Sequence, residues 1–351
     1  MYHPLHATSG VEALLAPGPV TAALERLLRR TVSDVIEERR LRSGICVIGA
    51  ISDAVSQAVR AQYEANPYPR WLSFEHVPPM AVADWIRSEA PDLQAPVEFS
   101  PPLRILVAGC GTGVETLSLA SRIAGVSVMA VDLSLSSLAY AQRKANELGI
   151  ANVEFCHGDI LELGDLTERF DVIYSVGVLH HTRDPQAGLR VLARLLHPGG
   201  LLKLGLYSEP ARADVNAVRD IVRQRQLAPG EAVIRAFRQE IFTAGLDSPL
   251  RSLLSWRDFY SMSECRDLLF HVQEHQFNLP RIEAMLHDQG LTVLGMSKQL
   301  PRSALLAYRR MFPSDAAMTD LHNWEAVEAQ HPDTFLGMYQ IWSRMPPRAA
   351  I

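Results

Sequence analysis

The sequence is poor in cysteine, and its few cysteines form no motif. Its 351 residues include four, Cys46, Cys110, Cys156 and Cys265, without a C-x-x-C pair. This scatter argues against a disulfide framework and against a structural zinc site. Apolar runs of the roughly 18 to 20 residues that cross a bilayer are missing, as is a basic N-terminal segment followed by an apolar one. We therefore expect a soluble, cytoplasmic protein that does not contact membranes.

An excess of positive charge is missing too. The chain has 34 lysines and arginines against 39 aspartates and glutamates, a formal net charge of −5. A weakly acidic chain lacks the electrostatic footprint of phosphate-backbone binding, so we expect no nucleic-acid partner. The absence of repeats argues against a solenoid. With 48% hydrophobic and 21% charged residues, the composition is that of a globular protein.

The middle of the chain alternates apolar strands with helices. This alternation is typical of an α/β fold with a doubly wound, Rossmann-like parallel sheet. The expected strands are 104–109, 127–132, 153–156, 170–175 and 201–207, and the expected helices between them are 114–123, 136–148 and 185–196.

The flanking segments have other patterns. Helical periodicity over 11–65, which ends before Pro67 and Pro69, predicts an N-terminal helical cap. A helix at 279–289 and strands at 291–295 and 335–342 complete the sheet after an insertion. The predicted organisation is a helical cap with an aromatic lid at 1–75, a core at 76–208, a helical insertion at 209–278 and the rest of the core sheet at 279–351.

Three glycines stand at the first predicted strand-to-helix turn: Gly109, Gly111 and Gly113. Glycine lets the backbone bend sharply and lets a ligand approach it closely, although a tight turn alone would also explain these residues. The dinucleotide fingerprint G-x-G-x-x-G requires a small residue at position 114, where this chain has valine. The loop therefore indicates a ligand site and disfavours a nicotinamide or flavin enzyme.

Acidic residues follow the next two strands. Asp132 closes the second strand, where a carboxylate can accept hydrogen bonds from both hydroxyls of a ribose, or can cap the next helix. Asp159 follows the third strand, where an adenine amino group would donate to it, or where it is a solvent-exposed turn residue. With the glycine loop, three successive strand ends fit one adenosine.

These motifs resemble those of the class I S-adenosylmethionine-dependent methyltransferases. The matching stretches are 105–113, 131–134, 158–160, 170–175, 178–181 and 196–200. The resemblance implies a seven-stranded sheet whose last strand is antiparallel, with S-adenosylmethionine as the cofactor. It also implies the following cofactor-binding residues: Gly109, Cys110, Gly111, Gly113, Asp132, Leu133, Asp159, Ile160, Ser175, Val176 and Gly177.

The flanks carry a narrower resemblance. Residues 60–71, 271–277 and 331–342 resemble the methyltransferase module that follows tetratricopeptide repeats in some bacterial proteins, although the repeats themselves are missing. In the first stretch, Tyr63 and its aromatic neighbours would form a lid over a cationic methyl donor, with Arg70 paired to the methionine carboxylate. Alternatively, these aromatic residues attach the helical cap to the sheet.

Candidates for the transfer chemistry lie after the fourth strand and in the insertion. His181 follows the fourth strand as a general base or a packing residue. His271, Glu274 and His275 have spacings of three and four, which would place them on one helical face. That face is either a substrate-pocket triad, with a base or a metal, or a solvated surface. The same residues also match the zinc-peptidase motif H-x-x-E-H, but the methyltransferase motifs elsewhere in the chain outweigh this reading. Tyr260 adds to the polar-aromatic character of this pocket.

The sequence thus predicts an S-adenosylmethionine-dependent methyltransferase. Its acceptor would be a hydroxyl, carboxyl or amine of a peptide or protein side chain or of a small metabolite, and no bound metal is assigned. The alternative is a cofactor-binding protein without transfer activity that acts as an interaction module or sensor. The acceptor atom and the oligomeric state stay open at this point.

Overall fold

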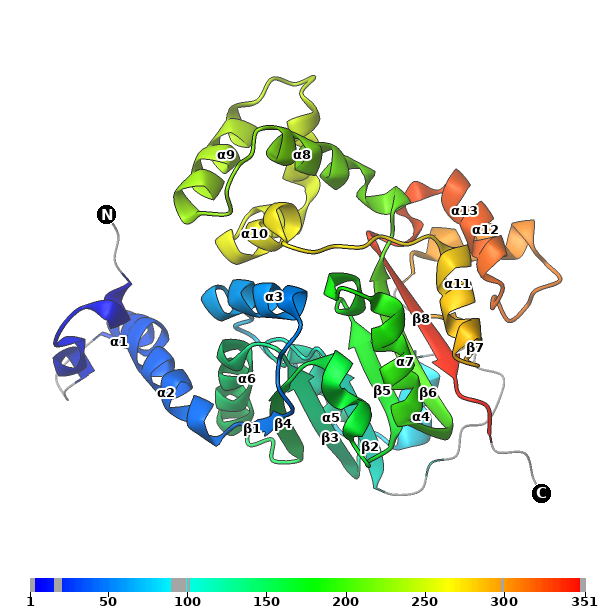
Figure 1. Cartoon of the computed structure of the whole chain (residues 1–351), viewed down its shortest axis with the longest axis horizontal. Helices are drawn as coiled ribbons and strands as arrows, with labels where there is room; N and C mark the ends of the chain where they lie inside the picture. The colour runs from blue at the N-terminus through cyan, green and yellow to red at the C-terminus, as the bar shows by residue number, and fades with distance from the viewer. Residues whose placement is uncertain (1–3, 16–20, 90–98, 100–101, 298–299, 348–351) are drawn as a thin grey trace.

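One mixed sheet organises the computed structural model, which describes residues 4–15, 21–89, 99, 102–297 and 300–347. Within these residues, eight strands have the order β1-β4-β3-β2-β5-β6-β8-β7 (Figure 1). Neighbouring strands from β1 to β6 are parallel, whereas β8 is antiparallel to both β6 and β7. The strands are β1 Cys46–Ile48, β2 Leu103–Ala108, β3 Val126–Asp132, β4 Val153–Gly158, β5 Phe170–Val176, β6 Leu196–Tyr207, β7 Thr292–Met296 and β8 Met338–Arg344.

The predicted Rossmann-like α/β class and the antiparallel last strand are confirmed, but the described sheet has eight strands instead of seven. The additional strand, β1, lies in the N-terminal segment that was predicted to be helical throughout. Its Val47 and Ile48 are β-branched and favour extended backbone. β1 pairs with the outer edge of β4, from Cys46 opposite Cys156 to Ile48 opposite Gly158. The N-terminal region therefore adds a strand to the sheet as well as helices.

Helices cover both faces of the sheet. They are α1 Ala22–Leu28, α2 Asp34–Leu41, α3 Ala54–Ala65, α4 Val82–Glu89, α5 Val114–Arg122, α6 Leu135–Leu148, α7 Pro185–Leu195, α8 Ala213–Gln224, α9 Glu231–Thr243, α10 Met262–Phe270, α11 Leu279–Asp288, α12 Arg302–Met311 and α13 Leu321–Gln330. Alternate residues of a strand point to opposite faces. Leu106 and Ala108 of β2 pack with α7, α11, α12 and α13, whereas Ile105 and Val107 pack with α4, α5 and α6. Among the described residues, no helix has the length and apolar character of a membrane span.

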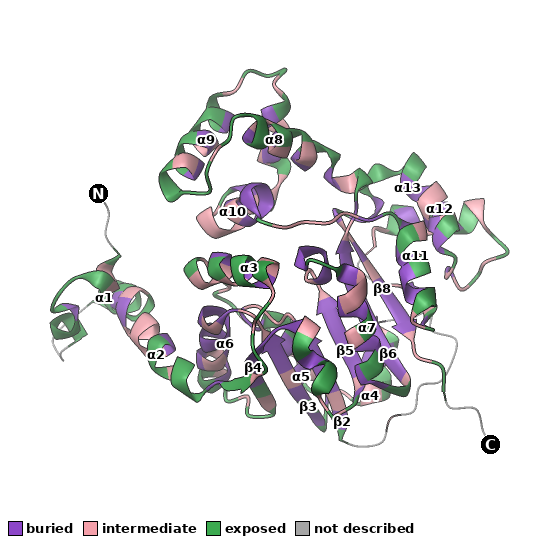
Figure 2. Cartoon of the chain, in the orientation of Figure 1, coloured by how far each residue is buried: buried purple, intermediate pink, exposed green. Residues whose placement is uncertain are grey.

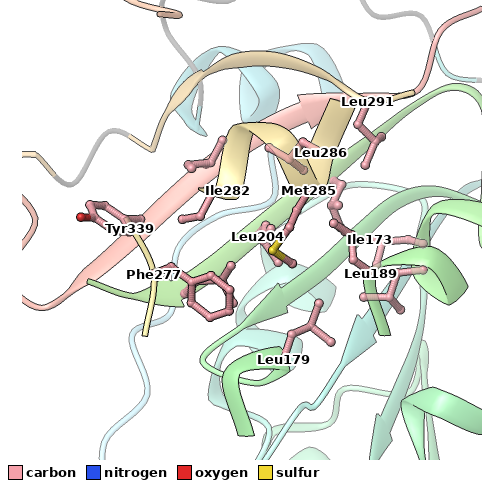
Figure 3. Close-up of a cluster of buried hydrophobic side chains, with 14 of the residues drawn as sticks. Ile173, Leu179, Leu189, Leu204, Phe277, Ile282, Met285, Leu286, Leu291 and Tyr339 are labelled. Atoms are coloured by element: carbon pink, nitrogen blue, oxygen red, sulfur yellow. The ribbon is translucent and has the colours of Figure 1, made fainter. Parts of the chain in front are cut away.

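The cluster that contains Leu106 and Ala108 also supports the carboxyl end of β5. Figure 3 shows side chains from β5, β6 and α11 close together, with Tyr339 of β8 at one side of the cluster. Leu179, which follows β5, and Phe277, which precedes α11, are both fully buried there. The cluster therefore holds the end of β5 close to the segment that leads into α11.

A buried arginine attaches the N-terminal helices to the core. Arg143 of α6 forms ion pairs with Glu38 at 3.0 Å and with Asp34 at 3.4 Å, both on α2. Its side chain is 7% exposed, so these pairs are largely shielded from water. Beyond α2, exposed residues predominate on α1 (Figure 2).

The segment between β6 and α11, which we expect to be an insertion, contains the helices α8, α9 and α10 and has a small core of its own. Val218 of α8, Phe237 of α9 and Leu268 of α10 belong to a separate hydrophobic cluster. Helix α10 begins at Ser261, whose Oγ accepts a hydrogen bond from the Glu264 amide at 3.1 Å. In Figure 1, α10 lies over α3, next to the carboxyl ends of the parallel strands. The insertion therefore covers the edge of the sheet where ligands bind in this class of fold.

The prediction that His271, Glu274 and His275 share a helical face is wrong. Helix α10 ends at Phe270, and His271 is already extended, with φ −61° and ψ 134°. The amide of His275 donates to the carbonyl of His180 at 2.7 Å, and that of Phe277 donates to Tyr207 at 3.0 Å. Because these amides bond to other parts of the chain, residues 271–277 run as an extended connection along the core.

Candidate active site

A cavity of about 330 Å³ lies at the carboxyl ends of β2, β3, β4 and β5, with walls from α3 and α10. Eleven of the predicted site residues line it: Tyr63, Gly109, Cys110, Gly111, Asp132, Leu133, Asp159, Ile160, Val176, Gly177 and His181. Seven others lie outside this lining: Arg70, Gly113, Ser175, Tyr260, His271, Glu274 and His275. The spacing of motifs along the chain therefore located the cavity better than it located the catalytic candidates of the insertion.

The glycine loop has little room for side chains. At Gly109, with φ +83°, a Cβ would lie 2.3 Å from a methyl carbon of Val178. At Gly111, with φ +52°, it would lie 2.8 Å from the carbonyl oxygen of Tyr68. Gly113 precedes α5, and a Cβ there would lie 2.7 Å from Ala141 of α6. Two glycines thus shape the cavity, and the third permits packing of α5 against α6.

Asp132 anchors the glycine loop through a hydrogen bond to its backbone. Its Oδ2 accepts the Gly111 amide at 2.7 Å, and its Oδ1 accepts the Ser134 amide at 2.9 Å. Burial raises the pKa of this carboxyl to about 6, although the two backbone hydrogen bonds act to lower it. The group is therefore mostly ionised at neutral pH, and its oxygens keep further lone pairs for a ligand hydroxyl.

Asp159 offers an unused acceptor. It is 2% exposed, and its Oδ1 accepts the Leu161 amide at 3.0 Å. Its Oδ2 is buried and has no hydrogen-bond partner in the part of the chain that the structure describes. Since a buried polar atom normally has a partner, an unpaired oxygen in the cavity wall fits a ligand that donates a hydrogen bond.

The loop after α3 closes one side of the cavity. Tyr68 and Pro69 line it, and the carbonyl of Pro69 accepts a hydrogen bond from the Thr112 hydroxyl. The indole N–H of Trp71 donates to the Thr112 carbonyl at 3.0 Å. Arg70 points elsewhere: it is exposed, and its guanidinium lies 5.7 Å from the ring centre of Tyr140. The structure thus brings Tyr63 and Tyr68 to the cavity but places Arg70 outside it.

The backbone of one residue, Gln273, fixes two stacked histidines in opposite tautomers. The rings of His181 and His271 lie 3.6 Å apart at their centres. His181 Nδ1 lies 2.7 Å from the carbonyl oxygen of Gln273, which can only accept, so Nδ1 carries the proton and Nε2 keeps its lone pair. His271 Nδ1 accepts the Gln273 amide at 3.1 Å, so its Nε2 carries the proton. Burial lowers the pKa of His181 to about 4, and this histidine is therefore neutral at pH 7.

The other candidates of the insertion face away from the cavity lining. Glu274 is buried between Arg212 at 3.2 Å and Arg219 at 2.6 Å. The side chain of His275 contacts that of Gln273 at 3.0 Å. Tyr260 is 53% exposed, and its hydroxyl donates to the Leu254 carbonyl at 2.7 Å. These contacts support the insertion itself, and Glu274 ties its end to α8.

The middle of the chain is similar in sequence to known methyltransferases. Residues 105–200 match the family model of a methyltransferase domain. A ubiquinone biosynthesis O-methyltransferase of Cereibacter sphaeroides is 30% identical over 162 residues, 43% of this chain and 64% of that protein. Residues 105–200 form a class I S-adenosylmethionine-dependent methyltransferase domain. An uncharacterised Synechococcus protein is 33% identical over 275 residues, 73% of this chain and 63% of that protein.

The chain spans less than two thirds of the length of these two relatives. Among solved structures, PKMT2 from Rickettsia typhi has a similar fold, with a TM-score of 0.57 and 17% sequence identity. That similarity covers 79% of this chain and 54% of the other. The same protein has also been solved in complex with AdoHcy. These similarities do not confirm the narrower resemblance to modules that follow tetratricopeptide repeats.

The cavity of the methyltransferase domain fits the cofactor of its class, S-adenosylmethionine. Asp159 presents an unpaired oxygen where an adenine amino group would donate, and Asp132 keeps lone pairs where a ribose would lie. The end of β5 adds Val176 and Gly177 to the lining, whereas Ser175 is fully buried behind them.

Asp267 and Tyr207 are among the cavity residues that the sequence did not predict. Asp267 of α10 lines the cavity and accepts a hydrogen bond from the Tyr63 hydroxyl at 2.7 Å. Tyr207, at the end of β6, lines it as well, with His180 stacked on its ring at 3.9 Å. Asp267 precedes His271 by one helical turn, a spacing that was available in the sequence.

Proposed function

We propose that the chain transfers a methyl group from S-adenosylmethionine to an acceptor held between the sheet edge and the insertion. The observation that carries this proposal is the cavity itself, which three successive strand ends line with Gly109, Asp132 and Asp159. S-adenosylmethionine supplies an electrophilic methyl group. The acceptor would be a hydroxyl, carboxyl or amine on a peptide or protein side chain or on a small metabolite.

The chain's own residues then have distinct tasks. The glycine loop and Asp132 would hold the methionine and ribose parts of the cofactor, and Asp159 would accept the adenine amino group. Methyl transfer is an in-line displacement, so positioning contributes most of the acceleration. Where the acceptor must lose a proton, His181 Nε2 is the base, because its lone pair is free and it lines the cavity.

The narrower resemblance remains part of the proposal. Residues 60–71 and 271–277 carry it, and the two stretches meet where the Tyr63 hydroxyl lies 3.1 Å from His271 Nε2. A contact between them supports treating the lid and the extended connection as one functional unit of this methyltransferase module.

Replacing Asp132 tests the proposed cofactor site. Asp132→Ala removes an acceptor for the ribose and the anchor of the Gly111 amide. We expect S-adenosylhomocysteine binding, measured by calorimetry, to weaken by about 1 to 3 kcal/mol. Asp165→Ala is the control, because Asp165 is exposed and lies outside the cavity lining. Equal affinities for the two variants would contradict the assignment of Asp132.

The alternative is a protein that binds the cofactor without transferring its methyl group. Incubation with methyl-labelled S-adenosylmethionine and a bacterial lysate separates the two. Labelled product that disappears with Asp132→Ala supports the transferase. Cofactor binding without labelled product favours the silent sensor, and absence of cofactor binding contradicts both.

A further inference from the structure

A carboxylate without a cationic partner stands in the wall of the cavity. Asp267 is 6% exposed and lines the cavity. Its hydrogen-bond donor is the Tyr63 hydroxyl at 2.7 Å, and His271 Nε2 lies 3.9 Å away. In the described part of the chain, no lysine or arginine forms an ion pair with Asp267. A buried charge is normally paired, so this carboxylate has the character of a ligand-binding group.

Several groups around Asp267 can accept a hydrogen bond from a ligand, because a tyrosine hydroxyl accepts as well as donates. Tyr63, Tyr68 and Tyr207 line the same cavity with it. His181 Nε2 has a free lone pair, because Nδ1 donates to Gln273. A ring nitrogen of His181, one of His271 and an Asp267 oxygen lie within 4.8 Å of one another. An ammonium ion has three N–H donors and a positive charge, which matches this set better than a hydroxyl or a carboxylate does.

The tautomers weigh against a metal ion at the same place. A metal would need a lone pair on His271 Nε2, but His271 Nδ1 already accepts the Gln273 amide. Nε2 of the neutral ring therefore carries its proton and faces the Tyr63 hydroxyl at 3.1 Å. The cluster is thus arranged as a hydrogen-bond network that ends on the Asp267 carboxylate.

Building on the methyl transfer proposed above, we propose that the acceptor is an amine, which Asp267 binds as its ammonium ion. The ammonium nitrogen gives one proton to His181 Nε2 and uses the freed electron pair to form a bond to the methyl carbon. The pair of the broken carbon–sulfur bond stays on sulfur. The products are a methylated ammonium ion, a neutral thioether and a proton, which leaves His181 for the solvent.

Matched fragments test this inference on the whole protein saturated with S-adenosylhomocysteine. Benzylamine, benzyl alcohol and benzoate share one ring and differ in charge, and ethylamine, ethanol and acetate form a smaller set. We expect at least one amine to bind about tenfold or more tightly than its matched alcohol and carboxylate, by calorimetry. Asp267→Asn should abolish that preference, because it removes the charge and keeps an acceptor for Tyr63.

Asp247→Asn is the matched control. It removes one exposed carboxylate from the same insertion, at a position outside the cavity lining, and should keep the amine preference. If Asp267→Asn does not fold, the pH dependence of amine binding to the unmodified protein takes its place. Burial raises the pKa of Asp267 to about 6, so benzylamine affinity should fall below pH 6 while benzyl alcohol affinity stays constant.

Several results would overturn the inference. They are equal binding of amines and alcohols, no amine binding at all, or an amine preference that survives Asp267→Asn. Weaker S-adenosylhomocysteine binding by Asp267→Asn, with the preference intact, would assign the carboxylate to the cofactor's own amino group and also overturn it. The proposed function fails separately, at the earlier step, if S-adenosylhomocysteine does not bind.

Discussion

At the scale of single residues, neighbouring atoms lie so close to the glycine loop that they leave no room for a side chain at Gly109 or Gly111. Gly111 faces the carbonyl oxygen of Tyr68, so the loop after α3 sits directly on the loop after β2. The Gly111 amide also donates to Asp132 at 2.7 Å. One residue therefore connects the lid, the glycine loop and the end of β3.

Gly111→Ala tests this connection. Its Cβ would lie 2.8 Å from the Tyr68 oxygen, at a φ of +52° that side chains rarely adopt. We expect a loss of about 1 to 3 kcal/mol of unfolding free energy and weaker S-adenosylhomocysteine binding, measured by urea unfolding and calorimetry. Gly164→Ala, where a Cβ meets nothing within 4 Å, is the control. Similar losses in both variants would argue against a special role of Gly111.

The positions of the acidic residues at the strand ends were predictable, because each one directly follows an apolar run that forms a strand. Asp132 and Asp159 each end a strand that an apolar run announces in the sequence. Asp267 follows no strand, and its spacing to His271 does not by itself predict a site, because its importance depends on α10 folding over α3 and on Tyr63 reaching it. Tertiary packing of the insertion decided that contact.

At the scale of elements, the alternating pattern predicted the strands and helices of the core within a few residues. It missed the three-residue strand β1 and the helices α4, α12 and α13. It also made residues 271–277 helical, since the spacing of His271, Glu274 and His275 matches a helix. Amides such as that of His275 instead bond to neighbouring elements, which no local pattern reveals.

Arg143→Ala tests how the N-terminal helices are held. The substitution would leave Glu38, 8% exposed, without its buried ion-pair partner. We expect a loss of about 3 kcal/mol in urea unfolding. Arg40→Ala, which breaks an exposed pair with Glu37, should cost less than about 0.5 kcal/mol. If the two variants lose the same stability, the Arg143 pairs are not what attaches α2 to α6.

At the scale of the whole molecule, buried titrating groups make stability depend on pH in two opposing ways. Burial lowers the pKa of His180, His181 and His271, so the folded chain stays neutral where the unfolded chain binds protons. These histidines therefore reduce stability as pH falls below about 6.5. Asp132 and Asp267, with pKa values raised to about 6, bind protons earlier in the folded chain and offset part of that loss.

His180→Phe isolates the histidine contribution. Both ring nitrogens of His180 are buried without a partner in the described residues, and the ring stacks on Tyr207. A phenylalanine keeps the stacking and cannot be protonated. We expect the variant to be more stable than the unmodified protein, with a gain about 2 kcal/mol larger at pH 5 than at pH 7.5. Urea unfolding at both pH values measures this, and a pH-independent gain would contradict it.

In the extended connection, residues 271–277, a backbone contact does work that a comparison of side chains among related sequences would not detect. The backbone of Gln273 sets the protonation pattern of two histidines through its N–H and its carbonyl, without using its side chain. Position 273 can therefore vary among related chains while its role persists, except that proline would remove the amide. An alignment scored on side chains would rate this position as unimportant, although the backbone there orients His181, the proposed base.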